Sequence, residues 1–311
     1  MILKQILEIF ELLDKPNSNG AEMADFLKER GAENVYVTSI QGKNGYTDGI
    51  KIYIAGKNGK KNGGNAPTLG IIGRLGGIGA RPLVKGFVSD GDGALTVLSA
   101  ALKLIEMKTK GDQLEGDIII TTHICPNAPT IEHEPVPFMG SPIDMRAMNE
   151  HEVLPEMEAI LSVDTTKGNK IVNSNGFAIS PTIKEGYILK ISDDLLTIME
   201  KVTGNLPLTI PVSQQDITPY GNDLFHINSL YQPSTATKSP LVGVAITTEV
   251  PVAGCASGAS HFGDIEKAGR FLIETAKAYG NLECEFYDRA EFEKILKLYG
   301  KMNRFQTMGI K

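Results

Sequence analysis

Cysteine is scarce in this chain of 311 residues. The three cysteines, Cys125, Cys255 and Cys284, are odd in number and follow no regular spacing. This pattern argues against a disulfide framework and favours a reducing compartment, where thiols stay reduced.

The chain also lacks an excess of positive charge, since its formal net charge is −6 and its pI is near 5.5. No stripe of Lys and Arg is available to neutralise phosphates, which argues against nucleic acid as a partner. No apolar run reaches the roughly 18 residues of a membrane span. Residues 1–15 (MILKQILEIFELLDK) have a helical period unlike that of a signal peptide. We therefore expect a cytoplasmic protein.

Familiar motifs of catalytic and metal sites are missing too. There is no C-x-x-C pair and no H-x-x-x-H, so no standard zinc spacing is present. The segment GRLGGIGARP (residues 73–82) is rich in glycine but has neither of the common phosphate-binding patterns. No G-x-S-x-G occurs, which excludes a serine hydrolase built on that turn.

What the chain does contain is an alternation of apolar runs of strand length with helical patterns. We expect helices at 2–14, 20–30, 93–108, 193–203, 264–279 and 289–299. We expect strands at 34–40, 49–55, 68–73, 117–124, 158–164, 186–192, 207–213 and 241–250. Such alternation predicts an α/β fold, a mainly parallel mixed sheet between two helical layers. No linker divides the chain, so we predict a single domain over residues 1–311.

Polar segments follow the predicted strands at their carboxyl ends, where open α/β sheets bind ligands. One of them, THICPNAPTIEH (residues 122–133), holds His123 and Cys125 two positions apart, on the same side of an extended chain. It ends on Glu132 and His133. A pocket or metal site is one interpretation, and a proline-rich turn with solvated imidazoles is the other.

Three further segments carry candidate carboxylates or histidines. In SDGDGA, Asp90 and Asp92 could bind a ligand or cap the helix that follows. A calcium loop of the EF-hand type is a poor match, because Ala101 stands where its final Glu belongs. In SVDTTKGN, Asp164 ends an apolar strand and could be a ligand or part of a polar turn. In AGCASGASH, His261 lies in a loop of small residues that permits close approach.

Taken in order, these segments resemble the zinc-dependent exopeptidase superfamily of dinuclear aminopeptidases and carboxypeptidases. LEIFELLDKPNSNGAEMADFLKERG is similar to the opening helix, turn and second helix of those enzymes. SDGDGA resembles the segment whose first Asp bridges two metals, here Asp90. LSVDTTKGN resembles the strand-end Asp that binds the second metal, here Asp164. QQDITPYGNDLFHI and GCASGASH are similar to the segments that would contribute Asp223 and His261.

The resemblance has clear departures. Arg74 and Gly76 stand where the superfamily has H-x-D, and Cys125 and Pro126 stand about where it has a Glu-Glu pair. Few residues are left for the usual inserted lid or dimerisation domain. The phrases HICPNAPT, DTTKGN and QDITPYGN also resemble an uncharacterised prokaryotic family of unknown function whose members have about this length.

The resemblance implies a remodelled, mononuclear site for a divalent metal, with zinc the preferred ion. Its predicted ligands are drawn from five residues: Asp90, His123, Cys125, Asp164 and His261. Glu132 or His133 would be the catalytic base, with Asp92 as a further candidate. Residues expected to contact the substrate are Arg74, Asp92, Asp223 and His226.

Three hypotheses remain open from the sequence. The first is a metal-dependent hydrolase of small amides, peptides or N-acyl amino acids, with Arg74 meeting a substrate carboxylate. The second is a metal-free homologue that binds a small anionic metabolite. The third is a cysteine enzyme that uses Cys125 with His123 or His133. In each case the partner is a small molecule or short peptide, and a homo-oligomer is compatible with all three.

Overall fold

The structure is a computed structural model that describes residues 1–43, 45–74, 87–126, 130–131, 138–218, 223–224, 229–250 and 260–306. Its helices are α1 (Leu3–Leu13), α2 (Gly20–Glu29), α3 (Asp92–Thr109), α4 (Met145–Glu152), α5 (Asp193–Thr203), α6 (Phe262–Gly280) and α7 (Arg289–Tyr299). The strands in the first half are β1 (Asn34–Gly42), β2 (Gly45–Ile54), β3 (Leu69–Gly73), β4 (Ile118–Ile124), β5 (Thr130–Ile131) and β6 (Phe138–Met139). Those in the second half are β7 (Ala159–Thr166), β8 (Gly176–Ile179), β9 (Ile183–Lys184), β10 (Tyr187–Ile188) and β11 (Leu241–Thr247).

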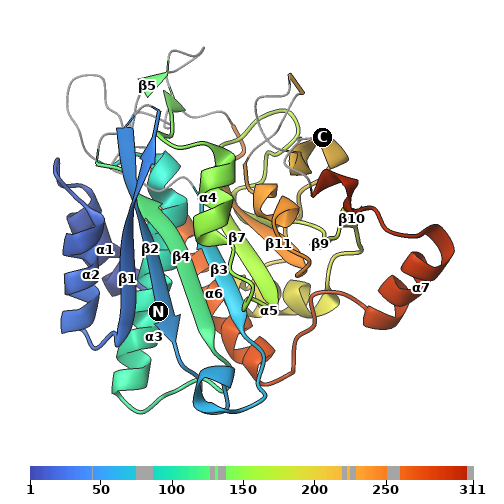
Figure 1. Cartoon of the computed structure of the whole chain (residues 1–311), viewed down its shortest axis with the longest axis horizontal. Helices are drawn as coiled ribbons and strands as arrows, with labels where there is room; N and C mark the ends of the chain where they lie inside the picture. Colours follow the sequence, from blue (N-terminus) through green and yellow to red (C-terminus); the bar gives the residue numbers. More distant parts are fainter. Residues whose placement is uncertain are drawn as a thin grey trace.

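One large mixed sheet forms the centre of the molecule (Figure 1). Its strand order is β1-β2-β4-β3-β7-β11-β9-β10, with β8 also pairing with β11. The four middle strands β4, β3, β7 and β11 are parallel to one another. The hairpin β1–β2 adds to β4 in antiparallel orientation, and β8 and β9 add to β11 in the same way.

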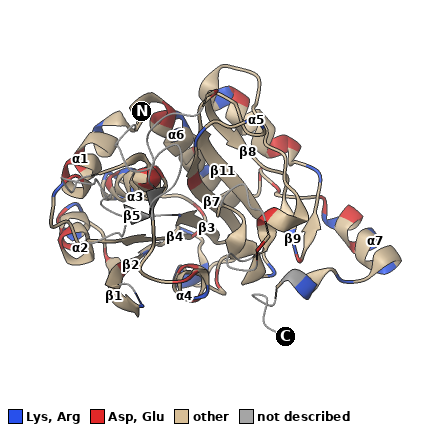
Figure 2. Cartoon of the chain, turned by 90° about the horizontal axis from the view of Figure 1, so that it is seen from above, with Lys and Arg blue, Asp and Glu red and all other residues tan. Residues whose placement is uncertain are grey.

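Alternating side chains of the middle strands build a core on each face of the sheet. Ile71 and Leu161 face the layer that includes α1, α3, α5 and α6, while Ile72 and Ile160 face the opposite side. Figure 2 shows α4 on that opposite side, across the sheet from α3 and α6. The arrangement confirms the predicted α/β fold with a mixed, largely parallel sheet. The single-domain organisation stays a prediction.

The start of α3 is pressed against the ends of two middle strands. A Cβ atom on Gly93 would lie 2.5 Å from the carbonyl oxygen of Arg74 and 2.7 Å from that of Val163. Only glycine permits this approach. It brings the first residue of α3, Asp92, to the carboxyl edge of the sheet, where the site described below lies.

Helix prediction was accurate for long amphipathic segments and failed for one short helix. Residues 193–203 and 289–299 form helices with the predicted bounds, and the other predicted helices differ by one or two residues at their ends. Helix α4 was missed, because the residues that it buries are Met148, Asn149 and Glu152, two of which are polar. A search for apolar periodicity does not find such a helix.

Two predicted strands were largely wrong, and residues 49–55 and 241–250 each have one end displaced, to Gly45 and to Thr247. Of residues 186–192, only Tyr187–Ile188 form a strand, and residues 207–213 contribute a single bridge at Thr209. In the described residues, no helix combines the length and apolarity needed to cross a membrane.

Candidate functional site

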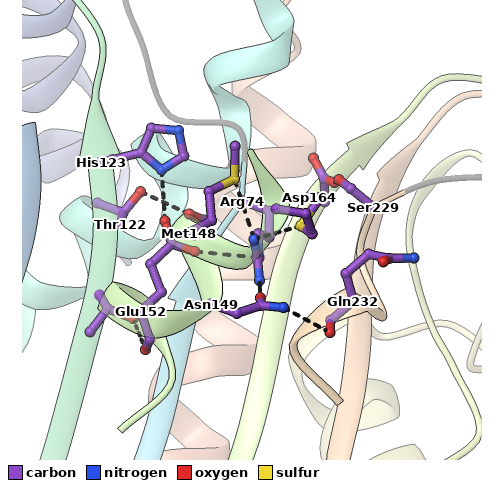
Figure 3. A network of polar contacts seen from close by, with 12 residues as sticks. Arg74, Thr122, His123, Met148, Asn149, Glu152, Asp164, Ser229 and Gln232 are labelled. Atoms are coloured by element: carbon purple, nitrogen blue, oxygen red, sulfur yellow. Dashed lines mark hydrogen bonds and ion pairs between the residues drawn. The ribbon is translucent and has the colours of Figure 1, made fainter. Parts of the chain in front are cut away.

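Three polar side chains lie in a row across the carboxyl ends of β4, β3 and β7. The register pairs Gly73 with Val163, so Arg74 comes beside Asp164 of β7, and the register with β4 brings His123 to its other side. Neighbouring strands are about 4.8 Å apart. The order His123–Arg74–Asp164 therefore follows from strand pairing, and all three side chains lie near α4 (Figure 3).

Arg74 is the largest fully buried side chain among the described residues. Its Nε atom lies 3.4 Å from Oε2 of Glu152, and Nη2 donates a hydrogen bond to the side-chain oxygen of Asn149. Its Nη1 atom contacts the sulfur atoms of Met145 and Met148 at 3.2 and 3.4 Å. A guanidinium group in such surroundings needs a carboxylate partner, since burying an unpaired charge is costly.

His123 forms the second contact with Glu152. Its Nδ1 atom is 2.6 Å from Oε1 of Glu152, and both side chains are buried. Figure 3 shows the second ring nitrogen pointing away from Glu152, out of the network. The backbone carbonyl of Glu152 accepts a hydrogen bond of 2.8 Å from the Thr121 hydroxyl of the same strand as His123. The carboxylate thus fixes the imidazole orientation and leaves Nε2 for chemistry.

Helix α4 supplies the two side chains that contact Arg74 and His123 from outside the row. Asn149 and Glu152 are three residues apart, so they lie on one face of the helix. The side chain of Asp144 caps the helix by accepting a hydrogen bond from the backbone N–H of Ala147. We call His123, Arg74, Asp164, Asn149 and Glu152 the strand-end network.

Asp164 closes this network at β7. Its Oδ2 atom accepts a hydrogen bond of 2.5 Å from the Ser229 hydroxyl, and Oδ1 accepts one of 2.7 Å from the backbone N–H of Thr165. Burial raises the pKa of Asp164 to about 6, although both hydrogen bonds and the charge of Arg74 lower it. The Glu152 carboxylate raises this pKa further.

A second group of polar side chains lies at the start of α3, and we call Asp92, Lys167 and Ser260 the helix-end cluster. The Ser260 hydroxyl donates a hydrogen bond of 2.5 Å to Oδ1 of Asp92, and the Lys167 ammonium lies 3.7 Å from Oδ2. Burial raises the pKa of Asp92 to about 7, against the lowering effects of Lys167 and Ser260. The nearby Asp264 carboxylate raises it further.

The structure describes four of the remaining predicted site residues. Asp90 is buried in a short 3₁₀ turn before α3, and the Cys125 sulfur lies 3.8 Å from the backbone carbonyl of Tyr46. His261 precedes α6 with 47% of its side chain exposed, and its Nδ1 is 3.9 Å from Oδ2 of Asp264. Asp223 is exposed, with a positive φ of 59°. Three predicted residues lie outside the described ranges: Glu132, His133 and His226.

A metal ion is a poor fit to the described residues. Among them, no three His, Cys, Asp or Glu side chains form a group that could hold a metal. The Arg74 guanidinium also lies in the row between His123 and Asp164, two of the predicted ligands, and its charge would repel a cation there. The mononuclear site and its zinc ion therefore stay predictions.

Sequence reasoning missed most partners of the network and of the helix-end cluster. Glu152, Asn149, Ser229 and Lys167 were not named as site residues. The available signal was the spacing of Met148, Asn149 and Glu152, which places them on one face of a helix after the capping residue Asp144.

Comparison with solved structures finds the same fold in enzymes of very different sequence. The bottromycin maturation enzyme BotP aligns with a TM-score of 0.50 and 12% identity over 89% of this chain and 69% of that one. A glutaminyl cyclase from Macrostomum lignano aligns with a TM-score of 0.50 and 11% identity over 91% of this chain and 90% of that one. At such identities the likeness establishes the fold alone. It confirms the distant resemblance to the exopeptidase-like fold.

No curated protein matches the sequence significantly. The family model described as "Protein of unknown function (DUF1177)" matches residues 38–309, which is most of the chain. This chain therefore belongs to the DUF1177 family.

Proposed function

We propose that this protein is a peptidase-like hydrolase of small amides or short peptides, with His123 as its catalytic base. The observation that carries the proposal is the contact of 2.6 Å between His123 Nδ1 and Glu152, with the second ring nitrogen directed out of the network (Figure 3). A carboxylate-backed imidazole is a common general base in hydrolytic enzymes. Its position at the carboxyl edge of the sheet is the usual ligand-binding side of such folds.

The residues of the network have distinct roles in this proposal. His123 Nε2 takes a proton from water as the water attacks an amide carbonyl, and returns it to the leaving amine. Glu152 holds the tautomer with hydrogen on Nδ1 and stabilises the imidazolium that forms. Arg74 and Asn149 hold the positions of Glu152 and α4, so they act as positioning residues.

A divalent metal, zinc in our expectation from the sequence, is the second candidate partner of His123. Histidines that bind metals also donate their other ring N–H to a carboxylate. A zinc ion would supply a water of lowered pKa. The described residues do not provide three donors for such an ion.

The metal-free binding hypothesis rests on Arg74 as the receptor for an anion. Two observations weigh against this role, since the Arg74 side chain is fully buried and its guanidinium contacts both Glu152 and Asn149. An incoming carboxylate would have to displace one of these partners. Wild-type protein that dipeptides stabilise against heat but that hydrolyses none of them would favour binding over catalysis.

The cysteine hypothesis can be tested by alkylation at neutral pH. Burial raises the pKa of Cys284 to about 12, so this thiol serves as an unreactive reference. A catalytic Cys125 would be alkylated much faster than Cys284. Equal rates would remove Cys125 from consideration.

The proposal is tested by hydrolysis of a panel of dipeptides and N-acyl amino acids. We expect His123→Gln to lower kcat/KM by about 10²–10⁴-fold, the usual contribution of a general base. The control is His151→Gln on α4, a partly exposed histidine outside the network, which should leave kcat/KM unchanged. Wild-type protein that cleaves nothing in the panel, or a His123 variant with full activity, would refute the proposal.

A metal arm separates the two candidate mechanisms. The same assay is run on protein treated with a chelator and on protein supplemented with Zn²⁺, Mn²⁺ or Co²⁺. Activity that survives chelation supports His123 as the base. Activity that returns only with metal favours the second candidate.

A further inference from the structure

The two edge strands of the large sheet differ in length and in what lies beside them. At one end, β10 is two residues long, and the C-terminal segment lies against it. The Tyr187 hydroxyl donates a hydrogen bond of 2.7 Å to the carbonyl of Gly300, and a Cβ on Gly186 would meet the carbonyl of Met302 at 2.1 Å. At the other end, β1 is nine residues long and pairs only with β2 among the described residues. Figure 2 shows β1 at the outer limit of the sheet.

The sequence of β1 lacks the features that normally protect an edge strand. NVYVTSIQG contains no Lys, Arg, Asp, Glu or Pro. Its side chains at 36–39 are exposed, including Tyr36 at 53% and Val37 at 37%. A long edge strand of this kind presents a row of backbone N–H and C=O groups to any strand that pairs with it.

We propose that β1 is the dimerisation edge of this protein, where it pairs in antiparallel orientation with β1 of a second copy. Pairing over all nine residues places a twofold axis at Thr38, so that Asn34 of one copy lies opposite the partner's Gly42. The surface on both copies is then the same, as an interface with twofold symmetry requires.

Charge favours a second copy of this chain as the occupant of the edge. In this register, Glu33 just before β1 lies opposite the partner's Lys43, and the reverse contact follows by symmetry. Glu33 is well exposed and lies 2.8 Å from Lys108, and Lys43 is exposed too. With a net charge of −6, two copies repel one another overall, so an uncharged strand between opposite charges is well suited to self-pairing.

Sedimentation velocity across a concentration series tests the dimer. We expect wild-type protein to reach twice its chain mass of 33.6 kDa. Thr38→Lys places two like charges opposite each other at the axis, and we expect at least a tenfold loss of dimer affinity. Thr38 is exposed, so the fold should tolerate the change. The matched control is Thr197→Lys at an exposed position of α5, which should stay dimeric.

A mixing experiment tests the register directly. Thr38→Lys and Thr38→Glu should each be monomeric alone, and an equimolar mixture should recover the dimer because opposite charges then meet at the axis. The proposal is overturned if wild-type protein remains a monomer at its highest concentration, or if Thr38→Lys dimerises as well as Thr197→Lys. If the equimolar mixture of Thr38→Lys and Thr38→Glu stays monomeric, pairing centred on Thr38 is ruled out.

Discussion

The strand-end network and the helix-end cluster both bury a carboxyl group at the same edge of the sheet, yet they stabilise its charge to different degrees. Asp164 accepts two hydrogen bonds, from Ser229 and from the backbone of Thr165, and its pKa rises only to about 6. Asp92 accepts one short hydrogen bond from Ser260 and has Lys167 at 3.7 Å, and its pKa rises to about 7.

The difference shows what sets the charge of a buried acid in this protein. Burial is the largest cause of the shift at both sites, so the number of hydrogen bonds and nearby charges determines how much of it is offset. At Asp92, Lys167 and the Ser260 hydroxyl lower the pKa against burial, and at Asp164 two hydrogen bonds and the Arg74 guanidinium do so.

The largest expected effect comes from removing the cation of the strand-end network. Arg74→Met leaves Glu152 buried without its guanidinium partner, and we expect a loss of about 3–5 kcal/mol in the free energy of unfolding. Urea denaturation at pH 7 measures it. The control is Arg146→Met on the same helix, which breaks an exposed ion pair with Glu150 and should cause no measurable change. Equal losses in the two variants would mean that the buried pair stabilises the fold no more than the exposed one does.

The pH dependence of stability should separate the two acids next. Each has a native pKa above its unfolded value of 3.8, so the folded state holds the proton more tightly. Each therefore favours folding at low pH, and that contribution is lost as the pH rises through the native pKa. For Asp92 the loss is roughly 4 kcal/mol between about pH 4 and pH 7.

Stability curves of Asp92→Asn and Asp164→Asn isolate these contributions. Relative to Asp92→Asn, wild-type protein should lose stability up to about pH 7. Relative to Asp164→Asn, the loss should end near pH 6. Parallel curves for wild type and both variants would show that neither acid retains its proton above the unfolded pKa.

The smallest expected effect comes from the two serines that donate to these acids. Ser229→Ala and Ser260→Ala each remove one hydrogen bond from a buried carboxyl group, with an expected cost of about 1–3 kcal/mol at pH 8. Because hydrogen bonds to ionised groups are stronger, the cost should fall once the acid is protonated. Thermal unfolding from pH 5 to pH 8 should show this fall at a lower pH for Ser229→Ala than for Ser260→Ala. The reverse order would contradict the assigned pKa values.

Much of the fold could be predicted because it depends on local patterns. Helix α3 is apolar on nearly all sides and α6 is amphipathic, so the spacing of their apolar residues predicts both helices. The apolar middle strands are equally clear. Strands β9 and β10 have two residues each, too few for any period to show, so β9 was missed and β10 was predicted too long.

The candidate site was predictable only in part. That polar residues follow β3, β4 and β7 is visible in the sequence, and it drew attention to Arg74, His123 and Asp164, which the strand register makes neighbours. The predicted ligand set also included Asp90, Cys125 and His261, and that set stays a prediction. Whether a metal binds and which residues hold it stays a prediction.

The sequence by itself determined which ionisable residues come at the strand ends, and that His123 and Cys125 face the same side of an extended chain, since side chains alternate along a strand. Only the tertiary structure decided that His123, Arg74 and Asp164 are neighbours, because register joins segments far apart in the chain. It also decided that the polar helix α4 lies over them. The physical reason is that a buried charge pair and hydrogen bonds hold α4 there. Polar contacts of this kind produce no apolar periodicity, so the sequence pattern does not predict them.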